Sequence, residues 1–475
     1  MLKNKLKYLL LILIFLALYT FRLDKVPVHL NQDEAMFALN AKDLTPSFYF
    51  WHLNAFWATP VIVYWTAIFL KFLPVSEIFI RLPSVFAGLI SVILAVVLVR
   101  KVLKNNQLAL LAGVLLAVSP AFFINSRLLL DNIYIVPFVL LWLILIDDNP
   151  FLSGLFLGLG FHSYHAAKIY MPLYLVATLV YGYMAKWSWK KLLLTVAGFA
   201  IPILLFLPWL KAHPDTLTNQ ISYASSIDSN LGSNFVKNYF SYFDPRILFV
   251  EGDRTLVHST GNTGVFPFPA VFLLVFGIFY AIRQKDLFSK LILFGFLIFP
   301  VAPAIINDPG RISRSLVVLP FGILLATYGI KFFLGQKDKI FKFVLWFIFA
   351  ASLFQFVFFL TDYFGSYRSR SWRVFNGDVG GVMESALRST KMREVQTIYL
   401  DKYIPHARFY YEFYEKKLGI TFENVMDYDF KEDGFSDLPA GSLLVSGRKI
   451  EDVEPIEIIR EPDGTESYFV YEKIK

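Results

Sequence analysis

Apolar segments recur through the first 361 residues of the chain, and they constrain its fold more than any other feature. A helix needs about 20 mostly apolar residues to cross a bilayer, and the chain is 56% hydrophobic with a mean hydropathy of +0.54. We predict eleven membrane spans, at residues 6–22, 79–100, 107–125, 133–146, 151–165, 169–185, 192–210, 266–283, 288–306, 313–334 and 342–361. The expected class is a polytopic α-helical membrane protein, and this composition excludes an ordinary soluble enzyme.

Basic residues in the short loops predict how these spans are oriented. When the spans alternate in direction, five basic groups fall on one side: Lys3/Lys5/Lys7, Arg100/Lys101/Lys104, Lys186/Lys190/Lys191, Arg283/Lys285/Lys290 and Lys331/Lys337/Lys339/Lys342. The positive-inside rule makes this side cytoplasmic. The first outer loop (23–78), the long loop 211–265 and the tail 362–475 then lie outside the cell membrane. The apolar segment 60–73 is expected to be an interfacial helix, because a further span there would invert every later loop.

The tail differs from the rest of the chain in charge and in pattern. Residues 362–475 hold 16 Lys and Arg against 21 Asp and Glu, whereas the remainder carries a net charge of +13. Anionic lipids explain a basic excess in membrane loops better than nucleic acid does. The tail should form a small extracytoplasmic α/β domain, with helices at 380–391 and 406–418 and strands at 395–400, 442–446 and 467–471. The absence of cysteine excludes disulfides and a thiolate nucleophile.

The first outer loop contains an adjacent acidic pair, Asp33 and Glu34. Asn31 followed three residues later by Glu34 resembles a capping box, so a helix should begin here and run to Leu44. One of the two carboxylates could project into a cavity as a general base. The alternative is that both acids only stabilise the N-terminus of the helix.

Charged groups also gather near the outer ends of several spans. Arg127 and Asp131 are four residues apart, so they can pair on one helical face. Ionisable groups at membrane depth indicate function, and the alternative is a salt bridge at the entrance of a helix. His162 and His165 are one turn apart, but without a third ligand we expect packed or hydrogen-bonded histidines rather than a metal site. Lys168 is a candidate anion ligand, and the alternative is that it snorkels to the interface.

Two later outer segments add more cations. Asp244–His258 and Asn307–Arg314 include Arg246, Arg254, Arg311 and Arg314. Together with Arg81, Arg127 and Lys168 they run against the positive-inside bias. This collection suggests a pocket for an anionic group such as a lipid phosphate.

These motifs resemble those of the membrane-embedded GT-C glycosyltransferases of the protein O-mannosyltransferase and lipid A aminoarabinose transferase kind. The matching residues are Asp33-Glu34, Arg81-Leu82-Pro83-Ser84, the Arg127-x-x-x-Asp131 turn, and the segment Tyr164…Lys168…Pro172. The resemblance extends over about residues 1–210 and more thinly to 334, and the tail has no diagnostic motif. It implies that residues 1–361 form a GT-C-like catalytic module.

The resemblance also implies the reaction and the residues that perform it. The family uses a polyprenyl-phosphate-linked sugar as donor, reaches its acceptor from the outer face and inverts the anomeric carbon. Asp33 would be the catalytic carboxylate, with Glu34 beside it, and Asp131 a second essential acid. Lys168 and Arg127 would steady the donor phosphate.

The chain departs from the family pattern before the interfacial helix. Many relatives have Lys-Pro-Pro where this chain has Ala58-Thr59-Pro60, so the phosphate contact of that lysine is missing. Lys168, Arg311 or Arg314 would have to replace it. Tyr164 and His258 are candidate contacts to substrate or metal. Asp33, Glu34 and His258 could bind a divalent ion, although their spacing does not require one.

The predicted function is therefore a glycosyltransferase that moves a sugar from a polyprenyl phosphate to a protein, lipid or envelope glycan. A glycosyl phosphate needs cations to absorb the charge of its leaving group and a carboxylate to deprotonate the acceptor. The main alternative is a transporter or flippase of lipid-linked sugars, which should show inverted repeats and charged mid-membrane segments. A membrane-anchored scaffold would leave the outer charges without a purpose.

Overall fold

The computed structural model of the protein describes residues 2–53, 55–216, 218–219, 234–429 and 434–474. The chain divides into two compact units. The first comprises Met1–Phe21, Pro46–Ile62 and Leu82–Asp362, and the second comprises Arg22–Thr45, Val63–Arg81 and Tyr363–Lys475. Two pieces of the first outer loop thus fold with the tail rather than with the apolar helices.

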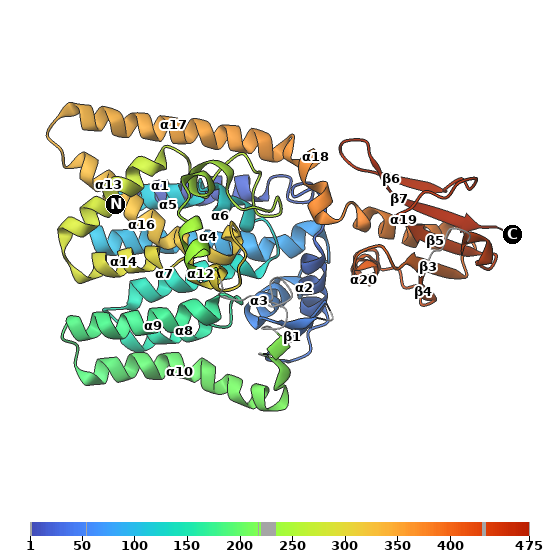
Figure 1. Cartoon of the computed structure of the whole chain (residues 1–475), viewed down its shortest axis with the longest axis horizontal. Coiled ribbons are helices and arrows are strands. Elements are labelled where there is room, and N and C mark those ends of the chain that lie inside the picture. Colours follow the sequence, from blue (N-terminus) through green and yellow to red (C-terminus); the bar gives the residue numbers. More distant parts are fainter. Residues whose placement is uncertain (1, 54, 217, 220–233, 430–433, 475) are drawn as a thin grey trace. The chain divides into compact units, whose positions relative to one another are not determined.

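The first unit is built almost entirely of helices (Figure 1). Its elements are α1 (Leu2–Thr20), β1 (Phe50–His52), β2 (Phe56–Ala58), α4 (Glu77–Leu103, begun in the second unit), α5 (Asn106–Ala117), α6 (Pro120–Asn125), the 3-10 turn η1 (Asp131–Tyr134), α7 (Ile135–Leu145), α8 (Pro150–Gly160), α9 (Ala167–Met184), α10 (Trp189–Ala212), α12 (Phe235–Ser241), the π-turn η2 (Ile247–Glu251), α13 (Ala270–Gln284), α14 (Leu287–Leu297), α15 (Val301–Ile305), the 3-10 turn η3 (Ile312–Ser315), α16 (Val318–Leu334) and α17 (Lys339–Phe364).

Each of the eleven predicted spans coincides with helix, although three are interrupted. The span at 313–334 begins in the 3-10 turn η3 and continues as α16 from Val318. The span predicted at 107–125 divides into α5 and α6, because Pro120 begins a new helix. The span at 288–306 divides into α14 and α15 just before Val301. Among the described residues, four helical stretches are long and apolar enough to cross a membrane by themselves: Glu77–Leu103, Trp189–Ala212, Leu287–Ile305 and Lys339–Phe364. The number of spans stays a prediction.

Glycines allow two helix pairs of the first unit to pack with their backbones in contact. A Cβ on Gly198 of α10 would lie 2.1 Å from the carbonyl oxygen of Phe151 in α8. A Cβ on Gly277 of α13 would lie 1.8 Å from the carbonyl oxygen of Leu325 in α16. Small residues commonly bring helices together in membranes, where lipid removes the hydrophobic drive for association.

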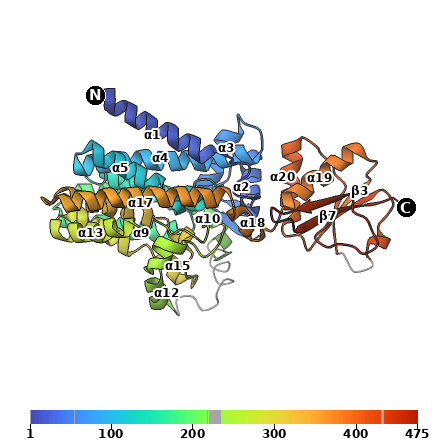
Figure 2. The same cartoon turned by 90° about the horizontal axis from the view of Figure 1, so that it is seen from above.

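The second unit combines a five-stranded sheet with helices from both ends of the chain (Figure 2). Its elements are α2 (Gln32–Lys42), most of α3 (Pro60–Leu70), α18 (Tyr367–Ser371), the 3-10 turn η4 (Trp372–Phe375), α19 (Val379–Met392), β3 (Thr397–Asp401), α20 (Ala407–Leu418), β4 (Val425–Tyr428), the 3-10 turn η5 (Gly434–Asp437), β5 (Ser442–Ser446), β6 (Glu457–Arg460) and β7 (Glu466–Lys473). The strand order is β4-β3-β5-β7-β6.

The sheet is mixed. Strands β4 and β5 run parallel to β3, whereas β7 is antiparallel to both β5 and β6. The two helices and three strands predicted for the tail correspond to α19, α20, β3, β5 and β7. The edge strands β4 and β6 were not predicted, because each has only four residues and carries charge (VMDY and EIIR).

Helix α2 is held against the tail by contacts within the second unit. The carbonyl of Leu30 accepts a hydrogen bond from the Tyr410 hydroxyl of α20 at 3.0 Å. The His29 ring lies 2.6 Å from the Glu461 carboxylate and 3.6 Å from that of Asp378. Burial raises the pKa of Glu461, but the hydrogen bond and charge of His29 and the hydrogen bonds from Ser467 and the Asp378 backbone together outweigh burial, so the pKa is lowered. These contacts fix the start of the helix that carries the acidic pair.

Candidate active site

The prediction that Arg127 and Asp131 share a helical face is wrong, because the segment between them is not helical. Helix α6 ends at Asn125, and Asp131 begins the 3-10 turn η1. Between them, residues 126–128 form a turn and residues 129–130 have no regular secondary structure. The fully buried guanidinium of Arg127 donates hydrogen bonds to the carbonyls of Tyr19 (2.6 Å) and Phe21 (2.9 Å). Arg127 therefore satisfies backbone groups that the end of α1 leaves without helical partners.

Asp131 contacts a residue from the first outer loop. The Thr59 hydroxyl donates to the Asp131 carboxylate at 3.1 Å and lies 3.4 Å from the carbonyl of Ser163. Thr59 is fully buried and belongs to the Ala58-Thr59-Pro60 segment. The segment thus touches the predicted second acid directly, without supplying a cation.

Lys168 does not snorkel, so that alternative is wrong. Its ammonium nitrogen is buried and has no hydrogen-bond partner among the described residues. The nitrogen lies 5.2 Å from the ring centroid of Tyr49, and the charge of Asp131 acts on it. A buried ammonium without a bound acceptor is costly, so this lysine is well suited to receive an anion.

Tyr164 marks the place where the other charges converge. Its hydroxyl is under the electrostatic influence of Arg314, Asp131, Arg311 and Asp253. These residues come from η1, from the loop after η2, and from the start of η3. Charges that the sequence separates by more than 180 positions therefore act on one side chain in the first unit.

Asp308 and Asp253 lie close to the guanidinium groups of Arg311 and Arg314. The Asp308 carboxylate lies 2.9 Å from Nε of Arg314 and 3.9 Å from Nε of Arg311. Asp253 lies 3.9 Å from Arg311 and accepts the backbone N–H of Ser313 at 2.7 Å. Burial raises the pKa of Asp253 against the opposing effect of Arg311. Arg311 and Arg314 are partly exposed, so their remaining N–H groups can still meet a ligand.

His162 is hydrogen bonded and His165 is packed against an aromatic ring, which agrees with the expectation of packed or hydrogen-bonded histidines. His162 contacts the Tyr49 hydroxyl at 2.9 Å, and His165 packs edge-on against Phe56. His258 is buried and lies 2.7 Å from the side-chain oxygen of Asn125. Within the described ranges, no three His, Asp or Glu side chains are grouped closely enough to hold a metal ion.

In the second unit, Asp33 and Glu34 have different surroundings. Both oxygens of the fully buried Glu34 accept hydrogen bonds from Arg81 at 2.8 Å, and Oε2 also accepts the Asn31 N–H at 3.0 Å. The predicted capping box is therefore confirmed. Asp33 lies one residue earlier, in the first turn of α2, and is partly exposed.

Sequence reasoning did not assign Thr59, Tyr49 or Asp253 to a site. Thr59 could have been found, because it lies in the Ala58-Thr59-Pro60 segment, where the chain departs from the motif it otherwise resembles. Asp253 lies in the segment Asp244–His258, in which only the arginines were expected to contribute to a site. Tyr49 had no distinguishing signal within its aromatic run, Phe48–Trp51.

Comparison with solved structures shows which proteins share this fold. Over its full length the fold is similar to ArnT from Cupriavidus metallidurans in the apo state, with a TM-score of 0.60, 13% identity, and coverage of 98% of this chain and 97% of that chain. The structure of the same protein bound to undecaprenyl phosphate gives a TM-score of 0.57 at 14% identity, with 97% of both chains covered.

A further solved structure shares the fold more distantly. The archaeal oligosaccharyltransferase AglB from Archaeoglobus fulgidus, in complex with an inhibitory peptide and a dolichol-phosphate, gives a TM-score of 0.51 at 13% identity. The similarity covers 86% of this chain and 63% of that chain. A comparison with curated protein sequences gives no match.

The chain therefore has the fold of ArnT, and more distantly that of the oligosaccharyltransferase AglB. More particularly, residues 58–211 match the model of the family described as dolichyl-phosphate-mannose-protein mannosyltransferase. The matched range contains Thr59, Asp131, Tyr164 and Lys168.

Proposed function

We propose that the protein transfers a sugar, with inversion, from a polyprenyl-phosphate-linked donor to an acceptor at the outer face of the cell membrane. The observation that carries the proposal is the buried ammonium of Lys168, which has no hydrogen-bonding partner among the described residues and is close enough to Asp131 to feel its charge. The donor phosphate would supply the missing anion. The polyprenyl phosphates bound by ArnT and AglB support this choice of donor.

The proposed chemistry assigns one role to each charged group. Lys168, assisted by Arg311 and Arg314, stabilises the negative charge that develops on the departing lipid phosphate. Asp33 removes the proton of the acceptor hydroxyl as it attacks the anomeric carbon. Asp131 orients Lys168 and Thr59. Glu34, whose oxygens are occupied by Arg81 and Asn31, holds α2 in place.

Replacing Lys168 by Ala tests the donor site. We expect the dissociation constant for a polyprenyl-phosphate sugar to rise about 10-fold to 100-fold, because a hydrogen bond to a charged group contributes about 1.5–3 kcal/mol. The KM for the acceptor should change little. Binding of a fluorescent donor to the purified protein measures the effect.

Two matched variants accompany Lys168→Ala. Lys168→Arg keeps the positive charge and should retain most of the donor affinity. Arg246→Ala removes an exposed cation that already pairs with Asp244 at 2.9 Å, and should bind donor as the wild type does. Unchanged donor affinity in Lys168→Ala would remove this lysine from the phosphate site.

The proposed topology is tested by fusing alkaline phosphatase after Lys475. Alkaline phosphatase folds only outside the cytoplasm. The basic loops place the tail on the outer side, so we expect the fused phosphatase to be active. A second fusion at Lys337, in a loop expected to be cytoplasmic, should be inactive. The opposite pattern of activities would invert the orientation and exclude an outer acceptor site.

A further inference from the structure

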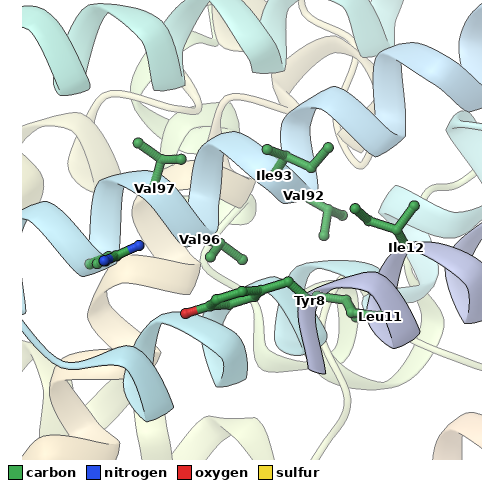
Figure 3. Close-up of a pocket in the computed structure, with 8 residues that line it drawn as sticks. Tyr8, Leu11, Ile12, Val92, Ile93, Val96 and Val97 are labelled. Carbon is green, nitrogen blue, oxygen red and sulfur yellow. The ribbon is translucent and has the colours of Figure 1, made fainter. Parts of the chain in front are cut away.

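An apolar cavity separates α1 from α4 within the first unit. Its volume is about 230 Å³, and its walls are formed by Tyr8, Leu11 and Ile12 of α1 and by Val92, Val96 and Arg100 among the residues of α4 (Figure 3). Dry apolar cavities of about 150 Å³ already accommodate a molecule the size of benzene. This one has room for a longer piece of hydrocarbon.

Two hydrogen-bond donors interrupt the otherwise aliphatic lining. The Tyr8 hydroxyl is buried and has no hydrogen-bond partner in the described part of the chain. In Figure 3 the tyrosine ring lies along the cavity, and its hydroxyl points away from Ile12. The other donor is Arg100, in the last turn of α4, for which the described residues provide no carboxylate. The neighbouring Lys101, by contrast, pairs with Asp148 at 2.7 Å.

The donors determine which lipid the cavity can select. An acyl chain gains little from moving between a bilayer and an apolar cavity, because both environments are equally apolar. Selection of one lipid over another must therefore depend on contacts with the lipid head group. A guanidinium and a phenol both donate to phosphate oxygens, and arginine can do so through two parallel hydrogen bonds. Other basic residues at the same helix ends, Lys7 and Lys104, are exposed and add to the attraction for an anion.

The cavity is distinct from the candidate active site. Arg100 lies 16 residues beyond Ser84 along α4, which corresponds to roughly 24 Å of helix. Ser84 contacts the hydroxyl of Tyr134, three residues after Asp131, at 3.2 Å. The basic residues around Arg100 belong to the side predicted to be cytoplasmic, where anionic lipids are abundant.

We propose that this cavity is a binding site for one acyl chain of an anionic phospholipid, whose phosphate is held by Arg100 and Tyr8. The proposal does not depend on the transfer reaction. It concerns a diacyl phospholipid that acts as a structural ligand, not the polyprenyl donor.

Native mass spectrometry of the full-length protein released from nanodiscs tests the site. The nanodiscs contain equal amounts of phosphatidylglycerol and phosphatidylcholine. We expect the wild type to retain one phosphatidylglycerol at least 10-fold more often than one phosphatidylcholine. Arg100→Gln should lose this preference but still retain either lipid, whereas Val96→Phe, which fills the cavity, should retain neither.

The control is Arg283→Gln, which alters a basic residue in the last turn of α13 that does not line the cavity. It should retain phosphatidylglycerol as the wild type does. Equal retention of the two lipids by the wild type would overturn the proposal, and so would an undiminished preference in Arg100→Gln. The proposal would also be overturned if the protein retained polyprenyl phosphate in place of phospholipid. The same holds if the wild type forms a dimer and Val96→Phe abolishes the dimer without changing lipid binding.

Discussion

Asp33→Asn should lower the turnover number for sugar transfer by about 100-fold to 10,000-fold, the range that a positioned general base contributes. The substitution keeps the shape of the side chain and removes its ability to accept a proton. Donor affinity should stay the same, because the proposed phosphate ligands are Lys168, Arg311 and Arg314. Single-turnover transfer from a purified lipid-linked sugar to an acceptor mixture measures the loss.

The alternative role of Asp33 makes a different quantitative prediction. An acid in the first turn of a helix interacts favourably with the helix dipole, and its loss costs about 0.3–1 kcal/mol of stability. If Asp33 only stabilises α2, Asp33→Asn should transfer sugar at nearly the wild-type rate and unfold at a slightly lower temperature. The two roles are therefore separated by the turnover number.

Asp43→Asn is the matched control for this substitution. Asp43 caps the other end of α2, is more than half exposed, and pairs with Lys416 at 2.8 Å. Removing its charge should alter stability by less than about 1 kcal/mol and leave transfer unchanged, because exposed ion pairs contribute little. A large loss of transfer in Asp43→Asn would show that the region around α2 is sensitive to any charge change, and Asp33 would lose its special role.

Local patterns in the sequence predicted local structure well. The capping box at Asn31 and Glu34 was recognisable because its two hydrogen bonds connect residues three positions apart. The helices of the tail and the eleven apolar segments follow from periodicity and hydropathy in the same way. The helical face expected to carry both Arg127 and Asp131 is absent, because a helical spacing was assumed across a turn, where other geometry applies.

Partners distant in the sequence were beyond such reasoning. Glu34 binds Arg81, 47 residues away, and His29 binds Glu461, 432 residues away. Nothing in the pattern of either segment specifies its partner. The same limit explains why seven cations looked equivalent: only the folded chain shows that Arg81 and Arg127 are occupied by buried partners while the ammonium of Lys168 is not.

Glu34→Gln should destabilise the protein by about 3–5 kcal/mol, the usual cost of removing one partner of a buried ion pair. Glu34 and Arg81 are both fully buried, so the substitution leaves the guanidinium charge without a counter-ion. The capping box would also lose its carboxylate at the Asn31 N–H. Chemical denaturation in detergent, followed by circular dichroism, measures the change in the free energy of unfolding.

A double-mutant cycle assigns this loss to the pair. Arg81→Met alone should be similarly damaging, because it also leaves the carbonyls of Leu23 and His29 without their donor. The double variant Glu34→Gln/Arg81→Met should lose less stability than either single variant, since no unpaired charge is then buried. Lys416→Met, which breaks the exposed pair with Asp43, should cost less than about 1 kcal/mol.

The same variants determine whether Glu34 also takes part in the reaction. If Glu34 acts only by holding α2, the transfer rate of Glu34→Gln should recover in the double variant along with its stability, because Asp33 regains its support. If Glu34 accepts the proton itself, transfer should stay low in the double variant even when the fold is restored. Recovery of stability without recovery of transfer would therefore move the catalytic carboxylate from Asp33 to Glu34.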